Sequence, residues 1–334
     1  MSFKMQSVSP FFHPLTLSRN LCSRPLRTEL GGRKLVAWRD ARGMPRVMED
    51  ACPHRGAPLS NGTVSENCLS CPYHGWKING TGHVAHMPAD AATRPSRRAI
   101  QTYDAVEHAG ILWAWAGASE LLPEERPPVP STLVPELDAD SGFRTVVGSM
   151  IFRAPLDAVV DNLTDMSHVA WLHSDSFGNK ESPGILFDEN KVEMRADGWG
   201  VAGTFTMHNK PPNALWDFAA VPEVRVTAEG ILPNSSRIAF TLAARVSFTT
   251  FAIASPLDAA RTNVFFMLAR RKEGLGSGLF NSPATDSLAL ASMVQVLSQD
   301  SAMLESLTPL RREMHAPSDA LQLAFRKARS AFVE

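Results

Sequence analysis

The amino-acid sequence predicts an α+β protein, in which an all-β segment precedes a domain with a large antiparallel sheet flanked by helices. Three observations predict this arrangement. From about residue 34 to 118, short apolar runs alternate with turn residues. Between 190 and 270, longer runs alternate apolar and polar residues, as the strands of a half-buried antiparallel sheet do. From about 285 onwards, the apolar residues recur with helical spacing.

A hairpin opens the all-β segment. KLVAWRD reads as a strand that ends at the turn DARG, and PRVMED follows as its partner. GILWAWAG at 110–117 is a further strand with Gly at both ends. The stretch LLPEERPPVPSTLVPELDADSG is rich in Pro and acidic residues and reads as a linker. We therefore expect one domain over 1–118 and a second over 119–334.

The second domain begins with a predicted helix over 154–173, with Pro155 near its first turn. Helices are also predicted for DSLALASMVQVLSQDSAMLESL and for DALQLAFRKARSAF at the end of the chain. The strand-like runs between them are KVEMRA, GVAGTFTMH, VRVTAEG, RIAFTLAARVSFTTFAIA and NVFFMLARR.

Composition excludes several functional classes. The 334 residues carry a net charge of −1, so no basic field indicates nucleic-acid binding. No apolar run reaches the roughly 18 residues that span a membrane, and the first residues lack the pattern of a signal peptide. Four cysteines are too few for a disulfide scaffold in a chain of this length. We therefore expect a reducing, cytoplasmic location.

Two Cys-His pairs stand close together in the all-β segment. Cys52 and His54 are separated by one residue, Cys71 and His74 by two, and a glycine follows each pair. Thiolates and imidazoles on two neighbouring loops are typical of a metal centre. A tetrahedral zinc site uses the same four ligands, and spacing alone does not exclude zinc.

The residues around the two Cys-His pairs favour a metal–sulfur cluster over a single zinc ion. CPHRG and CPYHGW resemble the two ligand loops of a Rieske [2Fe–2S] protein, in which two Cys hold one iron and two His the other. The resemblance implies that Gly56 and Gly75 let the backbone pass close to the cluster. Ala57 and Tyr73 stand where respiratory Rieske proteins carry an additional disulfide. This departure indicates the ferredoxin and oxygenase branch.

A second group of polar residues lies in DNLTDMSHVAWLH. Asn162, Asp165 and His168 are spaced i, i+3, i+6, so one helix would place them along one face. His173 follows five residues later, about 140° around an ideal helix. It reaches the same point only if the helix ends or distorts after His168. A purely structural helix is the alternative interpretation.

The pattern N-x2-D-x2-H-x4-H after a Rieske segment resembles the mononuclear iron site of Rieske non-haem iron oxygenases. The resemblance implies that His168 and His173 bind Fe(II) together with one carboxylate and leave positions open for O2. We expect Asp300, in SQDSAMLE, to supply the carboxylate. Asp286 and Glu305 are the alternatives.

The same resemblance assigns catalytic roles to two further residues. Asp165 bridges a Rieske histidine to an iron-binding histidine by hydrogen bonds. In this family the bridge joins neighbouring subunits, which implies a head-to-tail homotrimer. Asn162 lies close to the iron and hydrogen-bonds a water or the substrate.

The resemblance extends over most of the chain and is strongest to the single-component O- and N-demethylases and monooxygenases. It implies a terminal oxygenase that inserts oxygen from O2 into a C–H bond of a small aromatic or partly apolar molecule. Because the chain lacks a dinucleotide-binding fingerprint, electrons would come from a separate NAD(P)H-dependent reductase or ferredoxin. Residues that could anchor a polar group of the substrate are Arg153, Lys210, Trp216 and Arg245.

Three alternatives remain at this point. The first is a cis-dihydroxylating dioxygenase, which would use the same two metal centres. The second is a Rieske electron-transfer protein with an inactive iron site. A zinc-binding module is the third.

Overall fold

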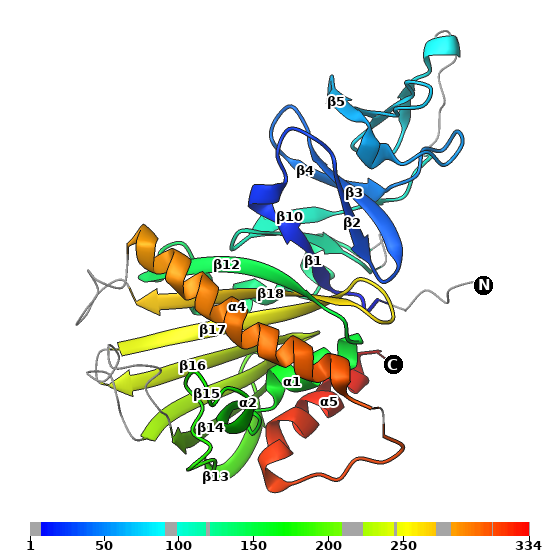
Figure 1. Ribbon diagram of the computed structural model, residues 1–334. Helices are drawn as coiled ribbons and strands as arrows, with labels where there is room; N and C mark the ends of the chain where they lie inside the picture. The colour runs from blue at the N-terminus through cyan, green and yellow to red at the C-terminus, as the bar shows by residue number, and fades with distance from the viewer. Residues whose placement is uncertain are drawn as a thin grey trace. The chain divides into compact units, whose positions relative to one another are not determined.

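The computed structural model describes residues 8–90, 99–117, 121–208, 223–243, 246–271, 282–308 and 310–333. The chain forms two compact units (Figure 1). The first comprises Met1–Val129 and the short segment Ser255–Ala259, and the second comprises Pro130–Ala254 and Ala260–Glu334.

Three small antiparallel sheets form the first unit. One has the order β1 (Phe12–Leu17), β11 (Ile111–Trp115), β10 (Ala105–His108). The next has the order β2 (Leu26–Leu30), β3 (Arg33–Arg39), β4 (Pro45–Glu49), β9 (Thr102–Tyr103). The last has the order β5 (Thr63–Ser65), β6 (Cys68–Ser70), β7 (Lys77–Asn79), β8 (Val84–His86). The prediction of an all-β first segment is confirmed.

Turn chemistry explains the predicted hairpin, which is also confirmed. Strands β3 and β4 pair antiparallel, with Arg39 opposite Pro45. Between them, the Asp40 carboxylate accepts hydrogen bonds from the backbone N–H groups of Arg42 and Met44, at 2.9 and 3.0 Å. An aspartate that bonds its own backbone in this way closes a tight turn.

A seven-stranded antiparallel sheet dominates the second unit. Its order is β12 (Phe143–Phe152), β18 (Thr262–Arg271), β17 (Val246–Pro256), β16 (Ser235–Ala243), β15 (Glu223–Ile231), β14 (Gly200–His208), β13 (Ile185–Met194). The long run RIAFTLAARVSFTTFAIA contributes to two strands, β16 and β17, instead of one. The predicted α+β class, with a large antiparallel sheet, is confirmed.

The predicted helix over 154–173 is wrong in its extent. It is divided into α1 (Leu156–Thr164) and the single turn α2 (Val169–Leu172). The break has a local cause, since the Asp165 carboxylate accepts hydrogen bonds from the backbone N–H and the hydroxyl of Ser167, at 2.7 and 2.6 Å. This turn competes with the helix for backbone donors.

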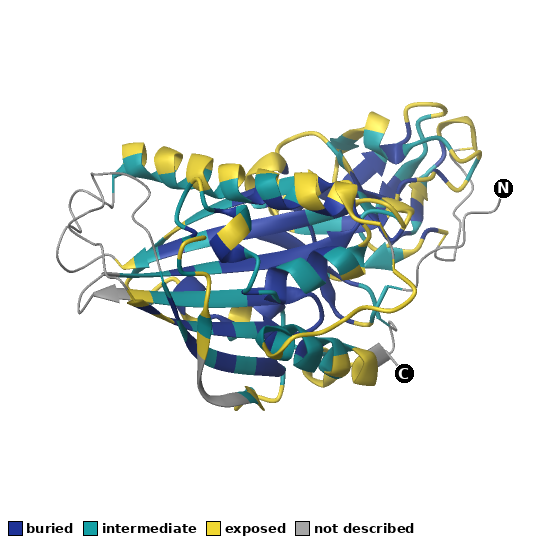
Figure 2. Cartoon of the chain, turned by 60° about the horizontal axis from the view of Figure 1, so that its bottom comes forward, coloured by how far each residue is buried: buried dark blue, intermediate teal, exposed yellow. Residues whose placement is uncertain are grey.

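Two longer helices cover the sheet. Helix α4 (Pro283–Ser306) packs on β12 and β18, and α5 (Ala320–Val333) packs on β14, β15 and α1. Most of α4 is exposed or half-exposed, and only Leu297, Asp300 and Leu304 are buried (Figure 2). Near its start, Asp286 forms ion pairs with Arg144 and Arg270. Charged contacts therefore contribute to the placement of α4.

Short 3₁₀ turns complete the described chain: Ser18–Asn20, Leu59–Asn61, Pro88–Asp90, Pro123–Glu125, Pro130–Leu133, Pro135–Leu137 and Pro317–Asp319. Three of them lie in the predicted linker. Within that stretch, the buried Glu136 accepts hydrogen bonds from Arg237 and from the Thr249 hydroxyl, each at 3.0 Å. This part of the predicted linker is therefore fixed to the sheet. Among the described helices, none has the length and apolar character needed to cross a membrane.

Replacement of Gly230 by alanine should destabilise the second unit. A Cβ atom at this position in β15 would lie 2.5 Å from the ring of Phe325, which is fully buried on α5. We expect Gly230→Ala to lower the free energy of unfolding by about 1–3 kcal/mol in urea denaturation, because overpacking forces the ring to move. Gly184→Ala is the matched control, since no atom lies within 4 Å of its Cβ position. An equal effect of both variants would contradict this packing argument.

Candidate metal centres

The two Cys-His loops have the same backbone conformation. In each loop the cysteine N–H and the glycine N–H form equivalent hydrogen bonds: Cys52 N to Ala57 O (2.8 Å), Gly56 N to Cys52 O (2.8 Å), Cys71 N to Trp76 O (2.8 Å) and Gly75 N to Cys71 O (3.1 Å). Gly56 and Gly75 have φ values of +71° and +68°, a region that glycine adopts without strain. The glycines therefore permit the turn that follows each pair.

The side chains of these loops face one another. Cys52 and Cys71 are buried and form no disulfide. The rings of His54 and His74 lie 4.5 Å apart between centroids, and Trp76 stacks on His54 at 4.6 Å. In the described part of the chain, His54 Nδ1 is buried without a hydrogen-bond partner.

The chemistry of these donors fits a Rieske cluster. Burial raises the pKa of the Cys52 thiol, so a metal-free site keeps that thiol protonated. A cluster would instead stabilise the thiolate. It would also give the buried His54 Nδ1 a partner. The loops could therefore hold two irons with two sulfur and two nitrogen ligands.

In the second unit, the structure brings together three residues that are far apart in the sequence. One ligand atom from each of His168, His173 and Asp300 lies within 4.8 Å of the others. Asp300 Oδ1 is 3.4 Å from His168 Nε2 and 3.3 Å from His173 Nε2. His173 and Asp300 are 2% and 4% exposed. Two imidazoles and one carboxylate at these distances could hold one divalent metal ion.

The break between α1 and α2 makes this convergence possible. His168 immediately precedes the single turn α2 and His173 immediately follows it. The next residues fold back closely, since the Gly178 N–H donates to His173 O at 2.9 Å. A Cβ atom on Gly178 would lie 2.3 Å from Val169 O. A continuous helix would have placed His173 about 140° away from His168.

The negative charges of Asp165 and Asp300 favour a bound proton or metal cation beside His168. Burial disfavours a charged imidazole, yet the carboxylates of Asp165 and Asp300 raise the pKa of His168 to about 9. Burial likewise disfavours the charged Asp300, but the hydrogen bond and the positive charge of His168 hold its pKa well below the usual range. The metal-free site therefore keeps one proton where a cation would bind.

The remaining predicted residues line the same site. Asn162 Nδ2 donates to Asp300 Oδ1 at 3.3 Å. Asp165 Oδ2 lies 3.4 Å from His168 Nδ1. The predicted common helical face of Asn162, Asp165 and His168 is wrong, since the helix ends at Thr164. The turn brings them together instead.

The two alternative carboxylates lie elsewhere. Asp286 pairs with two arginines of the sheet, and Glu305 is half-exposed, 3.5 Å from Arg153. Arg153 is itself exposed. Lys210, Trp216 and Arg245, the other suggested substrate anchors, lie outside the described residues.

Sequence reasoning missed one contact. Gln299 Oε1 lies 2.8 Å from His173 Nδ1, on the side of the ring away from Asp300. Helical periodicity gives no sign of such a contact, because the contact depends on how α4 packs against His173.

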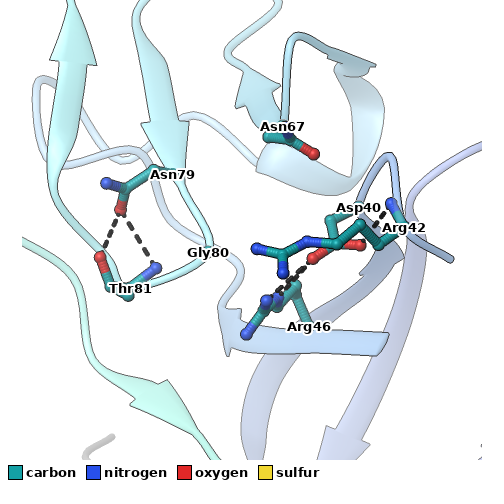
Figure 3. A pocket seen from close by; sticks show the side chains of 7 residues that line it. All are labelled: Asp40, Arg42, Arg46, Asn67, Asn79, Gly80 and Thr81. Atoms are coloured by element: carbon teal, nitrogen blue, oxygen red, sulfur yellow. Dashed lines mark hydrogen bonds and ion pairs between the residues drawn. The ribbon is translucent and has the colours of Figure 1, made fainter. Parts of the chain in front are cut away.

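A polar cavity of about 170 Å³ lies in the first unit (Figure 3). Its lining residues are Asp40, Arg42, Arg46, Asn67, Asn79, Gly80 and Thr81. Arg46 pairs with Asp40 at 2.8 Å, and Asn79 accepts hydrogen bonds from Thr81. Since no candidate metal ligand lines this cavity, it is not part of either metal centre.

Comparison with known proteins agrees with this geometry. Residues 12–104 match the Rieske [2Fe–2S] domain. Residues 152–334, more than half of the chain, match the vanillate O-demethylase oxygenase C-terminal domain. The chain belongs to the vanillate O-demethylase oxygenase family. It therefore combines a Rieske domain with the C-terminal domain of that oxygenase family, which uses mononuclear iron.

Some relatives of this chain are named as demethylases. The vanillate O-demethylase oxygenase subunit of Pseudomonas sp. (strain HR199 / DSM 7063) is 30% identical over 59% of this chain and 52% of its own length. The dicamba O-demethylase oxygenase component of Stenotrophomonas maltophilia is 30% identical over 58% of each chain. The matched region thus spans only about half the length of these relatives.

Solved structures of similar proteins share the fold. Dicamba monooxygenase bound to dicamba superposes with a TM-score of 0.81 over 97% of both chains, at 21% identity. NdmB of Pseudomonas putida CBB5 has a TM-score of 0.74, at 24% identity over 97% of this chain and 95% of its own. At this identity the similarity establishes the fold alone.

Metal binding at the His168 site should depend on pH. Because the pKa of metal-free His168 is raised to about 9, a divalent ion must displace its proton at neutral pH. We expect the affinity for Co(II) to rise by up to about tenfold per pH unit between pH 6 and 8. Calorimetry in buffers of different ionisation enthalpy should detect about one released proton. If the Co(II) affinity did not change with pH, the assignment of the extra proton to His168 would be wrong.

Proposed function

We propose that this protein is the terminal oxygenase of a multicomponent system. It takes electrons from a separate NAD(P)H-dependent reductase or ferredoxin and inserts oxygen from O2 into a C–H bond of a small molecule. The observation that carries the proposal is the convergence of His168, His173 and Asp300 in a chain that also has a Rieske domain. Residues 1–118 would form the electron-accepting domain and 119–334 the catalytic domain.

The cluster would be held by Cys52 and Cys71 on one iron and by His54 and His74 on the other. The equivalent hydrogen bonds of the two loops support this assignment, because they aim both Cys-His pairs at one point. The stacking of Trp76 on His54 restrains that ring. Imidazole in place of two thiolates raises the reduction potential of such a cluster.

The mononuclear iron(II) would be held by His168 Nε2, His173 Nε2 and Asp300 Oδ1. An iron ion with this ligand set leaves coordination positions open and supplies the activation of O2 when bound. Asn162 donates a hydrogen bond to the Asp300 carboxylate and restrains its orientation. The buried positions of His173 and Asp300 exclude bulk water from this side of the site.

Asp165 would connect the two redox centres. Its Oδ1 is occupied by the N–H and hydroxyl of Ser167, while Oδ2 lies toward His168 Nδ1. We propose a head-to-tail homotrimer in which Asp165 also accepts a hydrogen bond from a Rieske histidine of the neighbouring subunit. Such a bridge would hold the two imidazoles at a fixed separation.

We propose a monohydroxylation or an oxidative O- or N-demethylation of an aromatic or partly apolar substrate. The demethylases among the relatives support this reaction class. Insertion of oxygen into a methyl group on O or N gives a hemiacetal or hemiaminal, which releases formaldehyde. On another carbon the product is an alcohol.

We also propose a cytoplasmic location for this protein. The four cysteines, none of which forms a disulfide, agree with it.

Iron content and products test the proposal together. The purified chain should contain about three irons, two in the cluster and one mononuclear. With a surrogate reductase, a panel of methoxybenzoates, N-methyl heterocycles and methylated aromatic acids should yield formaldehyde or a hydroxylated product labelled from ¹⁸O2. About two irons per chain and no product would indicate an electron-transfer protein instead. A dihydroxylated product would identify the dioxygenase alternative.

Replacement of His168 should affect only one of the two metal centres. We expect His168→Ala to lose the mononuclear iron while the visible absorption of the cluster stays unchanged. Turnover should fall by more than about 100-fold, because losing a direct ligand costs more than the 10- to 100-fold typical of an outer hydrogen bond. His315→Ala, at a half-exposed histidine of the same unit, is the control. Retained turnover in His168→Ala would refute the ligand assignment.

Neutralising Asp165 should slow electron transfer without removing metal. We expect Asp165→Asn to keep about three irons per chain and to oxidise its cluster about 10- to 100-fold more slowly in a single turnover. Stopped-flow absorption of the prereduced cluster measures this rate. The exposed Asp175→Asn serves as the matched control. Unchanged single-turnover kinetics in Asp165→Asn would rule out the bridging role.

A further inference from the structure

One helix contacts both nitrogens of the same imidazole. Asp300 Oδ1 lies 3.3 Å from His173 Nε2, and the preceding residue of α4, Gln299, places its Oε1 2.8 Å from His173 Nδ1. The His173 ring is 2% exposed, so water does not compete freely for either nitrogen. The orientation of this ring and the position of its N–H group therefore depend on two consecutive side chains of α4.

The acceptor at Nδ1 decides which nitrogen carries the hydrogen. A neutral imidazole has one N–H group and one lone pair. Because the Gln299 carbonyl can only accept, it selects the form with hydrogen on Nδ1 and the lone pair on Nε2. That lone pair is directed to the side where Asp300 and His168 Nε2 converge. The opposite tautomer would direct an N–H group at the metal position.

The other histidine of the site has a different partner. His168 Nδ1 faces the Asp165 carboxylate at 3.4 Å, and that carboxylate is itself held by Ser167. His173 faces a neutral amide, which adds no charge to the site. The two imidazoles thus have unequal surroundings, one anionic and one neutral.

We propose that Gln299 is a positioning residue of the mononuclear site. Its side-chain carbonyl holds His173 as the Nδ1–H tautomer, and this hydrogen bond sets the affinity of the site for its metal. The inference rests on the proposed function only in that His173 is a metal ligand. Hydrogen bonds of this kind to ligating histidines typically change metal affinity by about 10- to 100-fold.

Metal affinity tests the proposal without turnover. The mononuclear iron is removed from the purified chain with a chelator, under conditions that keep the visible spectrum of the cluster, and Co(II) is titrated by calorimetry. We expect Gln299→Leu and Gln299→Met to bind Co(II) about 10- to 100-fold more weakly than the parent chain. Gln299→Glu keeps an acceptor at Nδ1, so its affinity should stay within about threefold of the parent. Its Co(II) EPR signal should change, since a carboxylate makes the imidazole a stronger donor.

Gln295→Leu is the matched control, because this exposed glutamine lies one turn earlier on α4. It should bind Co(II) as the parent does. The rescue by Gln299→Glu separates the loss of an acceptor from a general disturbance of α4. The proposal is overturned if Gln299→Leu and Gln299→Met bind Co(II) within about threefold of the parent, or if Gln299→Glu binds as weakly as they do. A parent chain that binds no Co(II) would refute the iron site itself, and the role of Gln299 with it.

Discussion

The buried carboxylate of Asp300 is the charge on which the second unit depends. A carboxylate that is 4% exposed needs partners, because transfer of an unpaired charge out of water costs several kcal/mol. Its partner here is the protonated imidazole of His168, Asn162 adds a weaker hydrogen bond, and His173 Nε2 lies 3.3 Å away. Every one of them comes from the region around α1 and α2. The requirement to pair this charge therefore fixes α4 against the break between those helices.

Few other contacts fix the position of helix α4. Only three of its residues are buried, so the apolar area that it removes from water is small for a helix of 24 residues. Apart from those buried residues, the salt bridges of Asp286 with Arg144 and Arg270 hold its first turns to the sheet. The two aspartates of α4 thus have separate roles: Asp286 anchors the helix, and Asp300 belongs to the candidate metal site. A sequence pattern cannot distinguish them, because both are aspartates on the same helix.

Local chemistry explains which features could be predicted from the sequence. The hairpin at Asp40 and the strands of the large sheet follow from turn residues and alternation, which act between near neighbours. The extent of the helix over 154–173 could not be predicted in this way. There the Asp165 side chain competes with the helix for backbone donors, and helical periodicity does not record that competition. The choice of Asp300 came from a family resemblance, since no spacing rule links it to His168. The contact of Gln299 with His173 depends on tertiary packing alone.

The two metal centres differ in how much of the fold they need. The candidate cluster ligands lie within residues 52–74, on loops with equivalent hydrogen bonds, so a short β segment suffices to aim them at one point. The candidate iron ligands require the helix break, the fold-back at Gly178 and the correct position of α4 together. A local disturbance of the second unit would therefore separate the candidate iron ligands and leave the candidate cluster ligands in place. This difference in construction is the physical reason why the two candidate metal centres can be altered separately in this chain.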